Sequence, residues 1–410
     1  MVDVKSRNDL VAWLSDKPRE WAQVIAVRAA LRVLPMALIE RASSDWDQKF
    51  AQGLFRAVCI AWTIGNLPSH NMFIAAANAV NKEIDENDDA HYSIRSIYAV
   101  LSANTSGIYF PQDAYDAVGF AADSADADYI TIWESVSHDF NWLNSEHFSA
   151  NDAKRLTHQA LWLNIPPENW DRSWQTATVR LLRLDPSYSV WIDWYERRIK
   201  GERAAFDIPG DTDRTEDKAI LIRLADATDE DFWGKGATHV NTTLQSWIDE
   251  ARIEAQIQEI VRKLRGGASA HYGAQDEMDK RAALLAELDR MLGKPPQGRF
   301  GIGGNSPPEP IDLPSAPVVL PQDLREPIEA ISAELEKTEP DALVIAEKAT
   351  LLHRAFKKLK KMASSAADKA ADAFGTAVGT AAGVGLVSYV GLSVTGVLPK
   401  ILDWLAPLIH

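Results

Sequence analysis

Cysteine is almost absent from this sequence of 410 residues, and that absence excludes several classes of protein. The single cysteine, Cys59, lies in the apolar run LFRAVCIAW, so a disulfide within one chain and a cysteine-rich metal site are both excluded. The same context indicates a buried structural thiol. The first residues carry Asp3, Lys5, Arg7 and Asp9 where a secretory signal peptide would have an apolar core. We therefore expect the body of the protein to fold in the cytoplasm.

Positive charge is also scarce. Lysine and arginine number 43 against 58 aspartates and glutamates, which gives a formal net charge of −15. A surface this acidic repels phosphate backbones. We therefore predict no nucleic-acid binding unless a local cluster of basic residues outweighs the negative charge of the rest of the surface. Hydrophobic residues make up 46% and charged residues 25% of the chain, which is typical of a folded protein with room for two or more domains.

Catalytic and cofactor motifs are missing as well. GIGGN at 301–305 runs into two prolines, and GVGLVS at 383–388 lacks a third glycine, so neither predicts a phosphate-binding loop. His138 and His147 are nine residues apart, too far for two metal ligands on one helix face. The alternative is a metal or acid–base site that these histidines build in space with Asp139, Glu146 or His158. We predict no enzyme activity, no metal and no cofactor.

Helical periodicity runs through most of the chain, and no series of alternating strands is present, so we predict an all-α fold. Thirteen of the 14 tryptophans lie between Trp13 and Trp247, which sets the first part of the chain apart in composition. The predicted segments are a Trp-rich helical body (1–235), a long amphipathic helical arm (236–292), a Pro/Gly linker (293–322), a basic amphipathic helical segment (323–372) and a hydrophobic membrane-inserting segment (373–410).

Within the body, Pro35 is predicted to kink or end the first long helix. Further helices are predicted at 47–64, 71–83, 92–103, 111–122, 126–143, 149–163, 167–183 and 187–200. In the arm, a helix of about seven turns is predicted to end at Gly266–Gly267, and a second helix covers about 275–292.

The helix at 187–200 places Trp191, Trp194 and Tyr195 on one face, and Gly201 is predicted to close it as a C-cap. Aromatic side chains on one face are typical of a helix that packs into a core. The alternative is an aromatic platform, which makes these three residues candidates for binding a protein partner.

The segments WYERRIKG (194–201), FWGKGATHVN (232–241) and GIGGNSPPEPI (301–311) resemble those of a family of uncharacterised bacterial proteins. In that family the linker typically reads GIGHNxPPEP and precedes a variable, often membrane-active C-terminal region. The resemblance covers roughly residues 160–312 and implies no activity. Gly304 stands where the family usually has histidine, which weakens a metal or catalytic role for the motif in this chain.

A basic amphipathic helix is predicted from about Pro340 to Met362. Its apolar face consists of Ile345, Ala349, Leu352, Phe356 and Leu359. Its basic end consists of Arg354, Lys357, Lys358, Lys360 and Lys361. Such a helix lies on an anionic membrane or binds an acidic partner, and a merely solvated helix end is the alternative.

The stretch 373–399 has no charged residue and is longer than the about 20 residues that span a bilayer. Glycines recur on one face of the predicted helix, at Gly375, Gly379, Gly383 and Gly391. Water-soluble helices avoid glycine, whereas membrane helices use it for close helix contacts, and the run resembles the glycine zippers of some channel-forming proteins. We predict a spanning or inserting segment, with a buried core helix and a disordered tail as alternatives.

The last residues, KILDWLAPLIH, are too short to span a membrane. Lys400 and Trp404 suit the membrane interface, so this tail is predicted to lie on the far side or to fold back after Pro399.

Together these features predict a cytoplasmic helical body whose C-terminal segment inserts and oligomerises in the inner membrane. The predicted partners are membrane lipid, other copies of the chain and a protein bound by the body. The predicted function is that of a toxin or phage-defence effector. The alternatives are a tail-anchored scaffold or adaptor, and a cytosolic ligand-binding protein or enzyme with a buried C-terminal helix.

Overall fold

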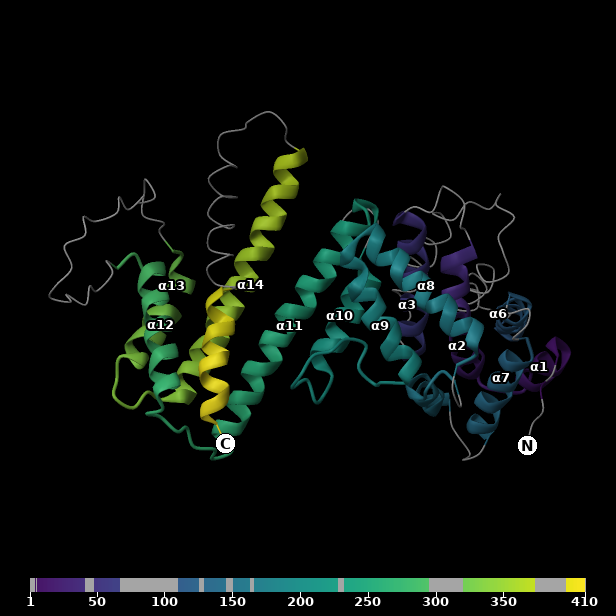
Figure 1. Cartoon of the computed structure of the whole chain (residues 1–410), viewed down its shortest axis with the longest axis horizontal. Coiled ribbons are helices and arrows are strands. Elements are labelled where there is room, and N and C mark those ends of the chain that lie inside the picture. Colours follow the sequence, from purple (N-terminus) through teal and green to yellow (C-terminus); the bar gives the residue numbers. More distant parts are fainter. Residues whose placement is uncertain are drawn as a thin grey trace. The chain divides into compact units, whose positions relative to one another are not determined.

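A computed structural model describes residues 4, 6–40, 48–66, 110–124, 129–144, 150–162, 166–227, 232–294, 320–372 and 396–409 of the chain. Within those residues the secondary structure is helical, and one isolated antiparallel bridge joins Ala270 to Ile409 (Figure 1). The all-α prediction is confirmed. The chain divides into two compact units: unit 1 comprises Met1–Ile208 and Asp213–Asp249, and unit 2 comprises Pro209–Thr212 and Glu250–His410.

Unit 1 holds most of the helices predicted for the body. Its elements are α1 (Arg7–Leu14), α2 (Arg19–Glu40), α3 (Gln48–Asn66), α6 (Phe110–Ser124), α7 (Tyr129–Asn144), η2 (Ala150–His158), α8 (Glu168–Leu184), η3 (Pro186–Tyr188), α9 (Ser189–Lys200), α10 (Thr215–Asp226), η4 (Trp233–Lys235) and the first part of α11 (Ala237–Arg265). The helix predicted at 149–163 is a shorter 3₁₀ helix, η2. Those predicted at 71–83 and 92–103 lie outside the described residues.

Helix α2 is the centre of unit 1, because α3, α6, α7, α8 and η2 all pack against it. In the described part of the chain it is the one helix long and apolar enough to cross a membrane, over Arg19–Ile39, and 94% of that window is buried inside the protein. A long helix that is buried along almost its whole length is the expected centre of a helical core.

Pro35 does not end α2, which continues to Glu40. Proline has no N–H, so the carbonyl of Leu31, four residues earlier, loses its partner within the helix. The hydroxyl of Tyr195 donates to that carbonyl at 2.6 Å, and the indole Nε1 of Trp170 donates to the next carbonyl, that of Arg32, at 2.8 Å. Two aromatic side chains therefore supply the hydrogen bonds that stabilise the helix around its proline.

Gly201 ends α9 as predicted. Its φ is 69°, in the left-handed region. Its N–H donates to the carbonyl of Arg198 at 3.2 Å, and the N–H of Glu202 donates to that of Arg197 at 3.0 Å, which is the pattern of a glycine C-cap. A Cβ at Gly201 would lie 2.4 Å from the backbone nitrogen of Ala160, so the loop after η2 packs directly on this glycine.

Replacing Gly201 by alanine should lower the free energy of unfolding of unit 1 by about 2–3 kcal/mol, from left-handed strain and from a clash with backbone that cannot move aside. Gly293→Ala is the matched control, because Gly293 has a φ of 70° and no atom within 4 Å of its Cβ position. We expect about 1 kcal/mol there. Urea unfolding with hydrogen exchange to localise the loss measures both, and equal losses would contradict the role given to the Ala160 contact.

Unit 2 is a bundle built around one apolar core. Its elements are the second part of α11, α12 (Gln275–Met291), α13 (Gln322–Leu335), α14 (Ala342–Asp372), a helix over 396–405 and η5 (Ala406–Leu408). Figure 1 shows the last helix, in yellow, beside α12 and α14, and α14 extending beyond the ends of α12 and α13. The predicted helix end at Gly266–Gly267 and the predicted helix at 275–292 are both confirmed.

The boundary between the compact units falls inside α11, between Asp249 and Glu250, and not at residue 235, where the composition changes. Val240 and Leu244 are fully buried in unit 1, whereas Ile257 and Ile260 belong to the core of unit 2. The predicted amphipathic arm therefore contributes its first part to the core of unit 1 and its second part to the core of unit 2. Most of the predicted linker, 295–319, lies outside the described residues.

Candidate functional site

The aromatic face of α9 lies inside unit 1. Trp191, Trp194 and Tyr195 have no exposed surface. The indole Nε1 of Trp191 donates to the side-chain oxygen of Asn241 at 2.7 Å, and Tyr195 bonds to α2 as described above. A side chain with no exposed surface cannot contact a partner on the folded protein, which corrects the partner-binding interpretation of these three residues.

The apolar face of α14 is also occupied. Its five predicted residues pack into the core of unit 2, where Ile345, Ala349 and Leu352 have no exposed surface. α13 packs along α14, and residues of α11 and α12 join the same core. This face therefore does not lie on a membrane in the folded bundle, because other helices of unit 2 already cover it.

The outer face of α14 carries two of the five basic residues that were predicted to contact lipid. Leu351 is 48% exposed, and the exposed Arg354 and Lys358 follow it at positions that share one helix face. Lys358 pairs with Asp323 at 3.2 Å, with both side chains largely in solvent. The exposed Leu351, followed by the two cations Arg354 and Lys358 on the same face, is the part of the predicted lipid-contact site that remains available.

Lys357 turns toward α11 instead of solvent. Its Nζ lies 3.8 Å from Oε2 of Glu254, and Nε2 of His353 lies 3.4 Å from the same oxygen. His353 is 1% exposed. Burial, followed by the charge of Lys357, lowers the pKa of His353, so the imidazole is neutral at pH 7. Glu254 consequently meets one cation and one neutral ring.

Part of the predicted membrane site lies outside the described residues. This applies to Gly375, Gly379, Gly383 and Gly391 and to the side chains of Lys360 and Lys361. The structure does fix the chain on both sides of 373–395. α14 precedes this stretch and ends at Asp372, and residues 396–409 follow it.

Residues 396–409, which we call the C-terminal tail, are part of the core of unit 2. The buried side chains of the tail are Val397, Leu398, Ile401, Leu402, Trp404, Leu405, Leu408 and Ile409. The indole Nε1 of Trp404 donates to Oε1 of Glu277 at 3.1 Å, and its ring stacks on Tyr272 with a centroid distance of 6.2 Å. The prediction that Trp404 lies at a membrane interface is therefore wrong for the folded bundle.

Polar contacts hold the tail along its length. Lys400 forms an ion pair with Glu287 of α12, and Lys280 of α12 pairs with Asp403 at 3.4 Å. At the end of the tail, the N–H of His271 donates to the carbonyl of Leu408 at 3.1 Å, next to the bridge between Ala270 and Ile409. The tail thus docks on α12 and on the loop that joins α11 to α12, and Lys400 lies in this contact instead of at a membrane surface.

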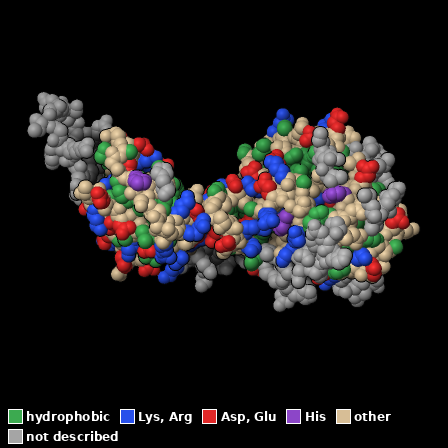
Figure 2. Space-filling model, turned by 90° about the horizontal axis from the view of Figure 1, so that it is seen from below, with side chains coloured by type: hydrophobic (Ala, Val, Ile, Leu, Met, Phe, Trp, Pro, Cys, Tyr) green, Lys and Arg blue, Asp and Glu red, His purple; other side chains and the backbone are tan. Residues whose placement is uncertain are grey.

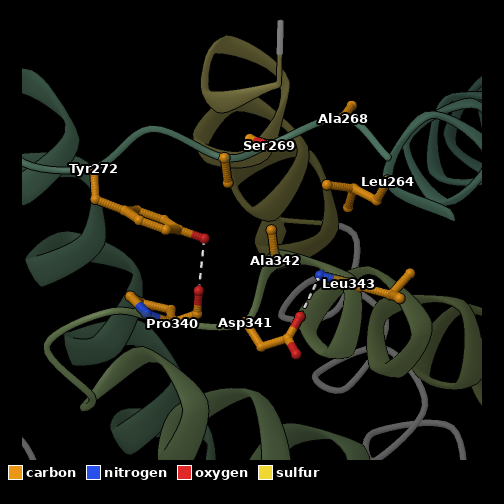
Figure 3. A pocket seen from close by; sticks show the side chains of 9 residues that line it. Leu264, Ala268, Ser269, Tyr272, Pro340, Asp341, Ala342 and Leu343 are labelled. Carbon is orange, nitrogen blue, oxygen red and sulfur yellow. Dashed lines mark hydrogen bonds between the residues drawn. The ribbon is translucent and has the colours of Figure 1, made fainter. Parts of the chain in front are cut away.

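A pocket of about 380 Å³ lies between that loop and the start of α14 (Figure 3). Figure 3 shows the hydroxyl of Tyr272 pointing at the carbonyl of Pro340, to which it donates at 2.6 Å. Oδ1 of Asp341 accepts from the N–H groups of Leu343 and Val344 and so caps α14. The side chains of Tyr272 and Asp341 are thus engaged in holding the fold, and apart from Ser269 the other side chains that line the pocket are apolar. The pocket contains no nucleophile and base in contact.

The described part of the ionisable group at 138–158 is held by other contacts. Asp139 has no exposed surface and pairs with Arg28 and Arg32 of α2. No set of three metal-ligating side chains comes together within the described residues, and Glu146 and His147 lie outside them.

Cys59 is buried as predicted, and burial raises the pKa of its thiol to about 12.

The visible surface has no continuous basic face. In Figure 2, acidic and basic side chains are interspersed over the face that is drawn.

Comparison of the chain with protein-family models, with curated protein sequences and with solved structures gave no match. The resemblance of residues 160–312 to a bacterial family therefore stays a prediction, and any function must be argued from the residues themselves.

Proposed function

We propose that this chain is a membrane-acting protein whose residues 373–395 enter the inner membrane and associate there with the same segment of other copies, while the helical units stay in the cytoplasm. The observation that carries the proposal is that this stretch, with five glycines and no charged residue, is tethered at both ends to one helical bundle. The exposed Leu351, Arg354 and Lys358 on α14 supply a surface of the kind that contacts anionic lipid. A toxin or phage-defence effector is the class of protein that this combination suggests.

The docked tail limits how the segment can meet a membrane. A helix that crosses a bilayer separates its two ends by about 30 Å and places them on opposite sides. Here the part of α14 up to Leu359 and the C-terminal tail belong to one core, and we infer that both ends of 373–395 stay on one side of the membrane while the tail is docked. A hairpin of two arms of about 11 residues reaches about 16 Å as helix, which is half the hydrocarbon thickness. We propose that the docked chain holds the segment in this non-spanning arrangement and that spanning requires release of the tail.

Replacing residues 373–395 by a Gly/Ser linker of the same 23 residues keeps both flanks and removes the apolar segment. On induction in bacterial cells, a chain whose tail is released by Ile401→Asp, at a fully buried position of the tail, should collapse the membrane potential, and the same chain with the linker should leave it intact at equal expression. Equal depolarisation by both chains, or by neither, would exclude the proposal.

The glycine face supplies a sharper test of association. The double variant Gly379→Leu with Gly383→Leu should abolish depolarisation, because leucine keeps facing helices from close approach. Val378→Leu with Ala382→Leu is the matched control on the opposite helical line and should remain active. If the glycine variant still depolarises, the segment acts without glycine-mediated contacts.

One observation favours a second candidate, a cytosolic ligand-binding protein. The tail contributes buried side chains to the core of unit 2, as it would in a protein whose C-terminal region is entirely core. Fractionation separates the two candidates. Recovery of the tail-released variant Ile401→Asp in the soluble fraction, without detergent and with no change in membrane potential, would favour the second.

A further inference from the structure

Unit 1 contains a buried arginine whose hydrogen-bonding capacity is only partly used. Arg198 of α9 is 1% exposed, and its guanidinium lies over the ring of Trp62 at 4.3 Å from the centroid. One nitrogen donates to the carbonyl of Ala204. Nε and Nη1 have no hydrogen-bond partner within the described part of the chain. A buried cation with unmet donors is costly unless an anion completes its contacts.

Further cationic and donor groups converge on the same place. The ring of His158, at the end of η2, makes an edge contact with Trp62 at a centroid distance of 6.2 Å, so one indole touches both His158 and Arg198. Nδ1 of His158 and Nε of Arg214 are buried and also lack a partner among the described residues. The close packing of Gly201 on the loop after η2 brings the ends of α9 and η2 together.

The charges that act most strongly on His158 are positive. Burial, followed by the charges of Arg214, Arg198, Arg203 and Lys154, lowers the pKa of His158 to about 4. The imidazole is therefore neutral at pH 7, and four full positive charges surround it.

The carboxylate of Asp217 faces this group, and its oxygens are already engaged. Oδ1 of Asp217 accepts from the N–H groups of Ala205 and Phe206 at 2.8 and 2.9 Å, and Oδ2 accepts from Arg214 at 3.0 Å. The positive charge of the cluster thus exceeds what Asp217 neutralises, in a chain whose net charge is −15.

We propose that Arg198, Arg203, Arg214, Lys154 and His158, which we call the Arg198 cluster, bind a phosphate-bearing small anion. Arg198 and Trp62 form the buried floor, and the exposed Arg203 and Lys154 stand at the solvent side. A phosphoryl group fits better than a single carboxylate, because it carries close to two negative charges and three acceptor oxygens for the arginine forks. The site lies in unit 1 and does not depend on the membrane function proposed for residues 373–395.

Titration calorimetry of the full-length protein with pyrophosphate, at constant ionic strength and pH 7, tests the site. We expect saturable binding, and we expect Arg203→Glu to weaken it at least about tenfold by reversing a charge at the solvent side. Arg183→Glu is the matched control, an exposed arginine of unit 1 on α8 that does not act on His158, and should change affinity less than about twofold. Absence of saturable binding, or equal weakening by both variants, would overturn the proposal.

A second measurement locates the anion. A phosphate beside His158 favours the imidazolium and should raise the pKa of His158 above about 4. At pH 5 the ring resonances of His158 should therefore move toward the protonated form as pyrophosphate is added, and they should move little in Arg203→Glu. Ring resonances that stay unchanged while pyrophosphate binds would place the anion elsewhere and refute the assignment.

Discussion

Replacing Asp139 by alanine should lower the free energy of unfolding of unit 1 by about 3–5 kcal/mol. Oδ2 of Asp139 accepts from Nε of Arg28 at 3.0 Å and from Nη2 of Arg32 at 2.8 Å, and all three side chains are at least 97% buried. Burial already lowers the pKa of Arg32 to about 10, and the charge of Asp139 opposes that effect. Without the carboxylate, two cations would remain in the interior.

The other hydrogen bonds of these arginines explain why the change should disturb more than one contact. Arg28 also donates to the carbonyls of Leu156, Gln159 and Ala160 at 2.8–2.9 Å, at the end of η2 and in the loop that follows. Arg32 donates to the carbonyl of Leu161 at 2.9 Å. The pair thus ties α2 to the loop that packs on Gly201. Loss of Asp139 should loosen that loop as well as remove the ion pairs.

Urea unfolding followed by tryptophan fluorescence measures this loss in unit 1, where 13 of the 14 tryptophans lie. Glu168→Ala is the control, because Glu168 pairs with Arg172 at 2.8 Å but both side chains are at least 70% exposed. Removing an exposed pair should cost less than about 1 kcal/mol. A loss for Asp139→Ala no larger than for the control would mean that Asp139 does not neutralise the buried arginines.

Much of the helical architecture could be predicted from the sequence. Glycines past the last apolar position marked the ends of α9 and α11, because only glycine takes the left-handed conformation cheaply. Arg28 and Arg32, four residues apart in an otherwise apolar run, were also a usable signal. That spacing places both cations on one face of a buried helix, and such a face requires a buried acid. Which acid it is could not be predicted, because Asp139 is more than 100 residues away.

The candidate sites were harder to predict, because the same residue types suit two environments. Trp404 and Lys400 suit a membrane interface, but they suit a helical bundle equally well. In this bundle Trp404 donates a hydrogen bond to Glu277, and Lys400 forms an ion pair with Glu287. The choice depends on whether a complementary surface exists elsewhere in the chain. No local sequence pattern predicts the Arg198 cluster, because its members come from η2, α9 and the loop before α10 and come together only in the folded chain.

Releasing the C-terminal tail should convert the chain to its membrane-spanning form, and Ile401→Asp is the substitution that tests this. Ile401 has no exposed surface in the core of unit 2, so a carboxylate there has no partner and should cost about 4 kcal/mol or force the tail out. Amide exchange in 396–409 should become fast. Residues 373–399, charge-free over 27 positions, would then be long enough to cross a bilayer with the tail on the far side.

The tail variant should therefore bind anionic vesicles more strongly than the native chain, and proteolysis from outside should no longer reach its last residues. Asp403→Ala is the matched control, because Asp403 lies two residues further on in the same helix but is 69% exposed and pairs with Lys280 at 3.4 Å. It should leave exchange and vesicle binding nearly unchanged. If Ile401→Asp frees the tail without increasing vesicle binding, the docked tail does not restrain residues 373–395, and the fixed ends of that segment serve only the packing of unit 2.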